Sequence, residues 1–117
     1  MNNSNVLIFN STVFDVVDRN GQPWLRLPQI GAALGYANPY KVQKAFDRHS
    51  DEFTENMTAV IKLPDLLPQS GATGQMRETR IFSPRGCYAL GMFARTKVAK
   101  DFRVWVLDVL EGKTKAA

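Results

Sequence analysis

The first quarter of the chain consists of short stretches rich in β-branched and aromatic residues, separated by turn residues. Residues 6–10 and 12–18 are two such stretches, and this composition favours strands. Asn20 and Gly21 are the preferred pair for a tight hairpin turn, and they lead into a further apolar stretch at residues 24–27. The pattern predicts an N-terminal antiparallel β meander.

Two helices are predicted next, and each begins near a proline. Pro28 suits the first turn of a helix and Gly35 suits its end, so residues 28–34 are predicted to form a short helix. Asn38 as N-cap and Pro39 at the first helical position begin a second helix that extends to about residue 48 or 49. The two segments form a helix-turn-helix-like pair, although the turn is somewhat long for that motif.

The second helix has two distinct faces. One face carries the residues expected to pack, which are Val42, Ala45, Phe46 and His49. The other face carries Lys41, Lys44 and Arg48. This second face is therefore free to bind a partner.

A β hairpin is predicted in the middle of the chain. Residues 58–63 and 78–82 are its strands, and the connection from Asp65 to Met76 contains a proline and two glycines. A connection of this length and composition is typical of a long surface loop.

Two further helices complete the predicted α+β fold. Ser83 and Pro84 repeat the cap-and-proline pattern and begin a helix that extends to about residue 95. Thr96 and Lys97 interrupt the helical pattern, with Thr96 as an alternative cap for the last helix, over residues 98–111. Gly112 ends that helix.

The last helix is apolar over much of its circumference. Its main apolar face consists of Phe102, Trp105, Val106, Val109 and Leu110, and Val104 and Leu107 flank that face. We expect the domain to bury this helix centrally. The alternative is that a partner covers part of it, for example a second copy of the chain at Trp105 or Leu107.

The composition fits one domain. The chain has 117 residues, of which 44% are hydrophobic and 22% charged, which suits a single core. We expect a domain over residues 1–112, with residues 113–117 as a tail or the start of a linker. The sequence lacks a long apolar run and a secretory signal, so a cytoplasmic protein is expected. Cys87 is the sole cysteine, which excludes an internal disulfide and favours core packing.

The positive charge is concentrated in the C-terminal half. The formal net charge is +4 and the isoelectric point is about 9.5, which favours nucleic acid or acidic protein partners. Residues 77–103 carry seven cations against two carboxylates, a net charge of +5. At the start of the last helix, Lys97, Lys100 and Arg103 stand three residues apart and share a partly exposed face.

Nucleic-acid contacts are predicted from the second helix, the hairpin and this cationic segment. The helix would reach phosphates or base edges, and the hairpin would act as a wing on the adjacent backbone. The alternative is a solvated face whose lysines and arginines serve solubility. The candidate nucleic-acid-binding residues are Tyr40, Lys41, Lys44, Arg48, Lys62, Arg77, Arg80, Arg95, Lys97, Lys100 and Arg103.

Signals of enzymatic activity are weak. The sequence contains no Gly-rich phosphate loop, paired-histidine metal motif or nucleophile elbow. His49, the sole histidine, suits a helix end better than a general base. Asp65 and Glu78-Thr79-Arg80 form a nuclease-like pattern, but an arginine stands where a catalytic lysine is expected. We expect a non-enzymatic protein with no catalytic residues, metal site, cofactor or small-molecule substrate.

Two blocks of sequence resemble a known family. The tighter block lies in the C-terminal half, with GCYAL at 86–90 and AKDFRVWV at 99–106. The looser block includes Trp24-Leu25, ALGY at 33–36 and Asn38-Pro39. In this order they resemble the N-terminal domain of the Bro family, found in phage antirepressors and in DNA-binding proteins of large DNA viruses. The chain departs from many relatives at Arg85, where they have an acidic residue before the glycine.

The resemblance implies a regulatory, non-enzymatic phage or prophage module that acts on transcription in the cytoplasm of a bacterial host. The first hypothesis is DNA binding through the basic helix face and the cationic C-terminal segment. The alternative is antirepression by direct binding to a phage repressor protein, with Trp105, Leu107 and the loop of residues 65–76 as the candidate surface. A homodimer is a further expectation, and a membrane partner is not expected.

Overall fold

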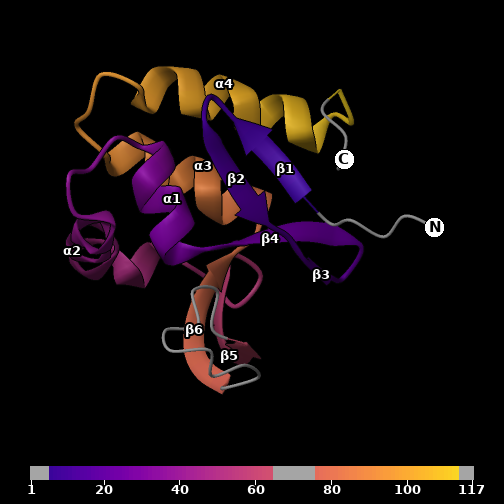
Figure 1. The fold of residues 1–117 in the computed structure, drawn as a ribbon. Helices are drawn as coiled ribbons and strands as arrows, with labels where there is room; N and C mark the ends of the chain where they lie inside the picture. Colours follow the sequence, from indigo (N-terminus) through magenta and orange to yellow (C-terminus); the bar gives the residue numbers. More distant parts are fainter. Residues whose placement is uncertain (1–5, 65–75, 114–117) are drawn as a thin grey trace, which may run out of the picture.

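Two antiparallel sheets and a set of helices build the fold (Figure 1). The computed structural model describes residues 6–64 and 76–113. Four short strands are followed by two short helices, a β hairpin and two longer helices. The predicted α+β class and the order of its elements are confirmed.

The N-terminal strands belong to two different sheets. β1 (Val6–Phe9) pairs with β2 (Thr12–Asp15), and β3 (Val17–Arg19) pairs with β4 (Gln22–Arg26). The structure thus divides the strand expected over residues 12–18 into two. The backbone N–H of Asp15, where β2 ends, donates to Gln29 Oε1 at 2.9 Å. A side chain from a later helix therefore satisfies the backbone at the point where the strand changes partner.

The predicted hairpin projects from the larger sheet. β5 (Thr58–Pro64) pairs with β6 (Met76–Phe82), and the strand order is β3-β4-β6-β5. β4 meets β6 at only two residue pairs of the described chain, Leu25 with Phe82 and Arg26 with Ile81. Most of the length of β5 and β6 therefore extends past the end of β4 (Figure 1). Residues 65–75 of the predicted loop lie outside the described residues.

The predicted helix pair is present, with one difference in geometry. Asn38 caps the second segment as expected, since its Oδ1 accepts the N–H of Tyr40 at 2.9 Å. The first turn of that segment is 3-10 rather than α-helical. Gly35, at φ 86°, ends the first helix as predicted. The helical elements in this region are α1 (Leu27–Ala33), the 3-10 turn η1 (Pro39–Lys41), α2 (Val42–Arg48) and the 3-10 turn η2 (Ser50–Glu52).

α1 and η1 approach each other closely at Gly31. A Cβ at this position would overlap the Pro39 carbonyl oxygen, far inside the normal contact distance of the two atoms. Glycine in a helix interior costs about 1 kcal/mol of stability relative to alanine. Here the close approach of the two backbones explains why glycine occupies this position. The lack of a side chain at Gly31 therefore sets how near η1 and α2 lie to α1.

The start of α3 and the end of α4 lie at local sequence signals. α3 (Pro84–Phe93) is capped by Ser83, whose Oγ accepts the N–H of Gly86 at 3.2 Å. α4 (Ala99–Leu110) ends at Gly112, which has a φ of 77°. Both boundaries agree with the predicted caps.

Thr96 does not cap α4, contrary to the alternative that the sequence left open. The N-cap position is Val98, which provides no side-chain hydrogen bond. The hydroxyl of Thr96 is buried and has no hydrogen-bond partner among the described residues. Thr96 and Lys97 therefore belong to the turn between α3 and α4.

An aromatic cluster joins α4 to the N-terminal sheet. Phe14 of β2 stacks on Trp105 with centroids 5.4 Å apart and planes 19° apart. Phe9 of β1 meets Phe102 edge to face at 5.5 Å. Such pairs add about 0.5–1.5 kcal/mol beyond the area that they bury. The first strands and the last helix thus share one hydrophobic core.

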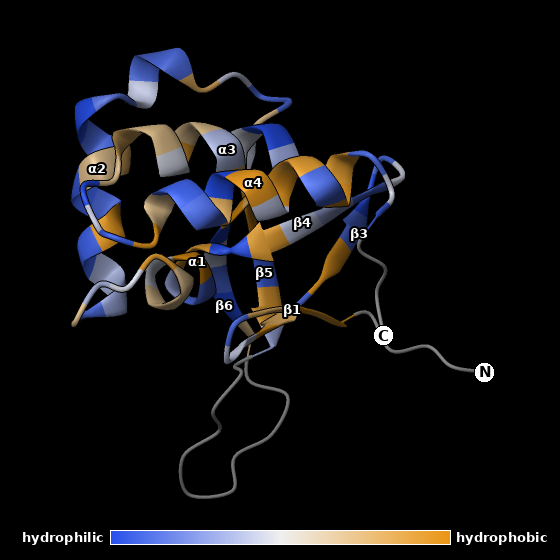
Figure 2. Ribbon diagram, turned by 90° about the horizontal axis from the view of Figure 1, so that it is seen from above, coloured by the Kyte–Doolittle hydropathy of each residue, from blue (hydrophilic) through white to orange (hydrophobic). Residues whose placement is uncertain are grey.

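The outer face of α4 is exposed, so the expected central burial of this helix is wrong. Phe102 and Val106 are buried, but Val104, Leu107 and Leu110 are 52%, 42% and 45% exposed. The helix lies on the surface with apolar bands that alternate with polar ones (Figure 2). The two apolar sides of α4 differ in exposure because only one of them faces the aromatic cluster.

We predict that Gly31→Ala lowers the free energy of unfolding by about 1–3 kcal/mol, because the new methyl group forces η1 away from α1. Urea unfolding measures this change. The matched control is Gly21→Asn, since the space around Gly21 is open and asparagine tolerates its left-handed conformation. Unchanged stability of Gly31→Ala would contradict the proposed role of this contact.

We predict that Cys87 is inert in the folded protein. Burial raises the pKa of its thiol well above the usual range, and Sγ donates to the Phe82 carbonyl at 3.6 Å. A thiol reagent should therefore modify Cys87 only as fast as the domain opens, and the rate should rise sharply in denaturant. Rapid modification under native conditions would show that the thiol is accessible.

Candidate nucleic-acid interface

Cations from two distant segments line one hollow beside α2. Lys41, Lys44 and Arg48 contribute one wall, and Arg95 from the turn between α3 and α4 contributes another. The hollow has a volume of about 230 Å³. We call it the basic hollow; its lining residues are Tyr36, Lys41, Lys44, Ala45, Arg48, Phe93, Arg95 and Thr96.

The basic hollow contains uncompensated positive charge. All four of its cations are exposed, and none of them forms an ion pair with a carboxylate in the described parts of the chain. Aspartate and glutamate are also missing from its described lining. An anion that enters the hollow therefore meets several cations without displacing an internal partner.

A stacked aromatic ring and an unsatisfied hydroxyl also line the basic hollow. The ring of Phe93 stacks on His49 with centroids 3.7 Å apart and planes 5° apart. Nδ1 of His49 lies 3.4 Å from Glu52 Oε2, so the predicted role of His49 as a helix-end packing residue fits its contacts. Thr96 Oγ1 is one of four buried side-chain polar atoms that lack a hydrogen-bond partner in the described chain, and a hydroxyl can donate to an anion.

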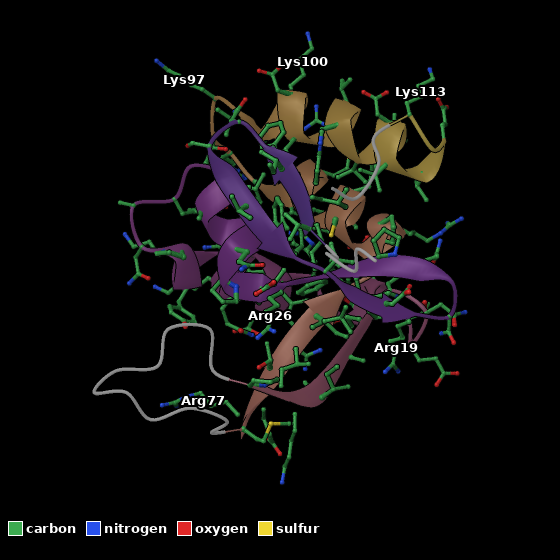
Figure 3. The ribbon with its side chains drawn as sticks, turned by 45° about the vertical axis from the view of Figure 1, so that its right-hand side comes forward. Arg19, Arg26, Arg77, Lys97, Lys100 and Lys113 are labelled. Carbon is green, nitrogen blue, oxygen red and sulfur yellow. The ribbon has the colours of Figure 1, made fainter. Side chains whose placement is uncertain are left out.

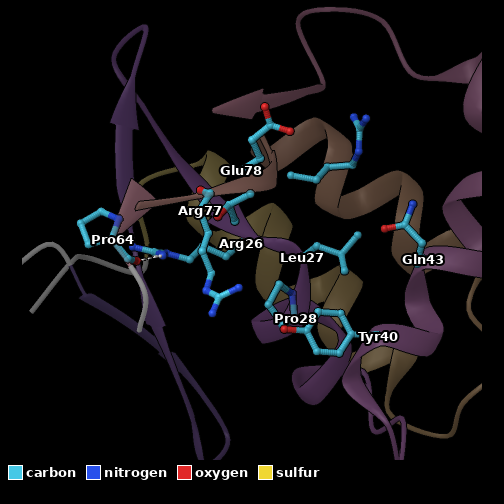
Figure 4. A pocket seen from close by; sticks show the side chains of 10 residues that line it. Arg26, Leu27, Pro28, Tyr40, Gln43, Pro64, Arg77 and Glu78 are labelled. Atoms are coloured by element: carbon cyan, nitrogen blue, oxygen red, sulfur yellow. Dashed lines mark hydrogen bonds between the residues drawn. The ribbon is translucent and has the colours of Figure 1, made fainter. Parts of the chain in front are cut away.

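A second concave surface lies on the other side of α2. It has a volume of about 230 Å³ and is bounded by the hairpin and by η1 and α2 (Figure 4). Tyr40 stands at its edge and is 64% exposed, while Arg77 points toward Pro28 and Tyr40 from β6. We call it the hairpin groove; its lining residues are Arg26, Leu27, Pro28, Tyr40, Gln43, Pro64, Arg77, Glu78, Thr79 and Arg80.

Arg80 holds the hairpin against α2. Its Nη1 donates to Thr58 Oγ1 at 3.0 Å, and its guanidinium lies 4.6 Å from the centre of the Phe46 ring. The side chain is half-buried in these contacts. Among the predicted site residues, Arg80 therefore has a clear structural task.

Arg26 is the cation in the hairpin groove that the sequence did not indicate. It is 8% exposed, and its Nη1 donates to the Pro64 carbonyl at 3.0 Å. Burial lowers the pKa of its guanidinium, and nearby Asp15 opposes that shift. An arginine between Leu25 and Leu27 in an apolar strand was the available signal, because such a position requires a specific partner.

The remaining predicted cations line neither concavity. Lys62 is exposed on β5, and Lys97 and Lys100 extend outward from the start of α4 (Figure 3). Arg103 instead donates from Nη1 to the Gly91 carbonyl at 3.0 Å and thereby links α4 to α3. The predicted cationic set is thus divided between the basic hollow, the hairpin groove and separate surface positions.

The two predicted partner-binding residues lie on opposite sides of α4. Trp105 is half-buried in the aromatic cluster with Phe9 and Phe14. Leu107 is on the outer face and, with Leu110, lines a hollow of about 330 Å³ that Tyr88 also borders. Leu107 is therefore accessible to a partner, whereas Trp105 contributes mainly to the fold.

The described residues include neither a cluster suited to a metal ion nor a helix suited to a membrane. No group of three or more histidine, cysteine, aspartate or glutamate side chains suited to a metal ion occurs among them. The helices within the described ranges are all too short or too polar to cross a membrane.

The comparisons with known proteins point to one family. The family model described as BRO family, N-terminal domain, matches residues 12–111, a range that includes both concavities and the last two helices. No curated protein and no solved structure matches the chain. The family is regulatory and non-enzymatic and is associated with phage antirepressors. The resemblance found in the sequence is therefore confirmed, and the chain belongs to the BRO family as an example of its N-terminal domain.

Proposed function

We propose that this regulatory domain binds DNA through the basic hollow and the exposed side of α2. The observation that carries the proposal is the meeting of Lys41, Lys44, Arg48 and Arg95 in one concavity whose lining contains no carboxylate among the described residues. Phosphate groups are the anions that such a surface meets along a duplex. The proposed setting is the cytoplasm of a bacterial host, where phage DNA is accessible.

The shape of the hollow also supports phosphate binding. Lysine provides a compact charge and arginine a planar fork of donors, so the two types together suit an oxyanion from several directions. The hydroxyl of Thr96, whose oxygen is buried without a described partner, belongs to a residue of the same lining. We expect a phosphate in the hollow to meet positive charge from both walls.

We predict that the double substitution Lys44→Gln and Arg48→Gln lowers affinity for duplex DNA by at least about tenfold, since each charged contact contributes about 1.5–3 kcal/mol. The slope of log affinity against log salt should fall by about 1.8, because each lost phosphate contact removes about 0.9. Fluorescence anisotropy with a labelled duplex at several salt concentrations measures both quantities.

The matched control removes the same charge elsewhere. Arg85→Gln with Lys113→Gln changes two exposed cations outside the basic hollow, so it should affect affinity and slope much less. Equal losses in the two double variants would show that only net charge matters. Failure of the unsubstituted domain to bind at low salt would refute the proposed function.

A second candidate function is antirepression by contact with a phage repressor protein. The exposed apolar row on α4, formed by Val104, Leu107 and Leu110, favours it. Exposed apolar residues that cluster on one helix are typical of protein-binding surfaces. The hollow beside Leu107 and Tyr88 would receive a side chain of the repressor.

For this candidate we predict that Leu107→Glu abolishes release of a phage repressor from its operator while leaving the fold intact, because Leu107 is already 42% exposed. A gel-shift assay with the purified repressor and its operator measures release. The variant with Lys44→Gln and Arg48→Gln should retain full activity in this assay. If the Leu107→Glu variant releases the repressor as well as the parent does, this face of α4 is excluded as the repressor-binding surface.

A further inference from the structure

The exposed side of α2 carries an acidic residue that phosphate binding alone does not explain. Asp47 is exposed and is the sole carboxylate within Val42–Arg48. A carboxylate beside Lys44 and Arg48 weakens attraction to phosphates. Within the described chain, Oδ1 of Asp47 accepts a hydrogen bond from Nε2 of Gln43, at 2.9 Å. We therefore interpret Asp47 as a residue that orients the side chain of Gln43.

This contact determines which way the amide of Gln43 faces. An ionised carboxylate only accepts hydrogen bonds, so the nitrogen of the amide must face Asp47. One N–H of Gln43 is thereby used, while its second N–H and Oε1 remain for a ligand. The side chain lines the hairpin groove, beside the exposed ring of Tyr40. Gln43 thus presents one donor and one acceptor side by side.

We propose that Gln43, oriented by Asp47, is a specificity-determining residue that reads adenine in the major groove. The inference rests on the proposed DNA binding. Adenine presents an acceptor at N7 and a donor at N6 on its major-groove edge, the complement of the free amide atoms of Gln43. Guanine presents two acceptors there, so it leaves Oε1 without a donor.

The surroundings of α2 fit this placement. The basic hollow lies on one side of the helix and Arg77 of the hairpin groove on the other. Gln43 and Asp47 are one helical turn apart on α2, and Gln43 lines the hairpin groove. α2 spans about 10 Å at a rise of 1.5 Å per residue, a length that the major groove accommodates. Phosphate contacts on the two sides of α2 would position Gln43 over base edges.

The test begins with selection from a random duplex library, followed by anisotropy on the selected duplex and on versions with each adenine replaced by guanine. The parent should prefer adenine at one position. Gln43→Ala should reduce that preference about tenfold or more, since a bidentate pair contributes about 1–3 kcal/mol of discrimination and 1.4 kcal/mol is tenfold. Preferences elsewhere and the salt slope should not change.

Asp47 provides a sharper test, because the two possible roles predict opposite results. Asp47→Ala removes a negative charge and should strengthen binding to all duplexes, yet it should weaken the preference for adenine. Asp47→Asn should strengthen binding and keep the preference, because its side-chain oxygen still accepts from Gln43. If Asp47 acts through charge alone, both variants keep the preference. Thermal unfolding of each variant verifies that the fold is intact.

The outcomes separate this inference from the proposed function. DNA binding with an unchanged base preference in Gln43→Ala, or with no base preference in the parent, overturns the role of Gln43 and leaves DNA binding in place. Absence of DNA binding by the parent overturns both. Loss of the adenine preference in Gln43→Ala and Asp47→Ala, with retention in Asp47→Asn, supports the inference.

Discussion

The backbone contact between Gly31 and Pro39 sets the position of α2, and both concavities depend on that position. α2 forms a wall of the basic hollow on one side and of the hairpin groove on the other. From within, the fully buried Val42 and the nearly buried Phe46 hold the helix against the core. Any residue larger than glycine at position 31 would overlap the Pro39 backbone and force η1 and α2 to shift relative to α1.

Five arginines of this domain form two groups that differ in their contacts. Arg26, Arg80 and Arg103 are at least half-buried and donate to protein oxygens, so they fasten the hairpin and α4. Arg48 and Arg95 are exposed and lack such described contacts. Because buried guanidinium groups need partners within the protein, a count of cations in the sequence overstates the charge available to a ligand.

The boundaries of the elements could be predicted because caps are local. Asn38, Ser83 and Gly112 each begin or end a helix through contacts with their sequence neighbours. The break in the strand at residues 12–18 could not be predicted from the sequence, since it depends on β1 and β4 as separate pairing partners. The exposure of the outer face of α4 could not be predicted either, because helical periodicity does not show which apolar side meets the core.

The same distinction applies to the candidate site. Helical spacing was enough to place Lys41, Lys44 and Arg48 on one face of the helical segment formed by η1 and α2. Their position beside Arg95 depends on the tertiary structure, because Arg95 lies far away in the chain.

The aromatic cluster that joins Phe9 and Phe14 to Phe102 has a consequence for the order in which the chain folds during synthesis. The first strands have their hydrophobic partners in the last helix, so folding on the ribosome waits until α4 has emerged.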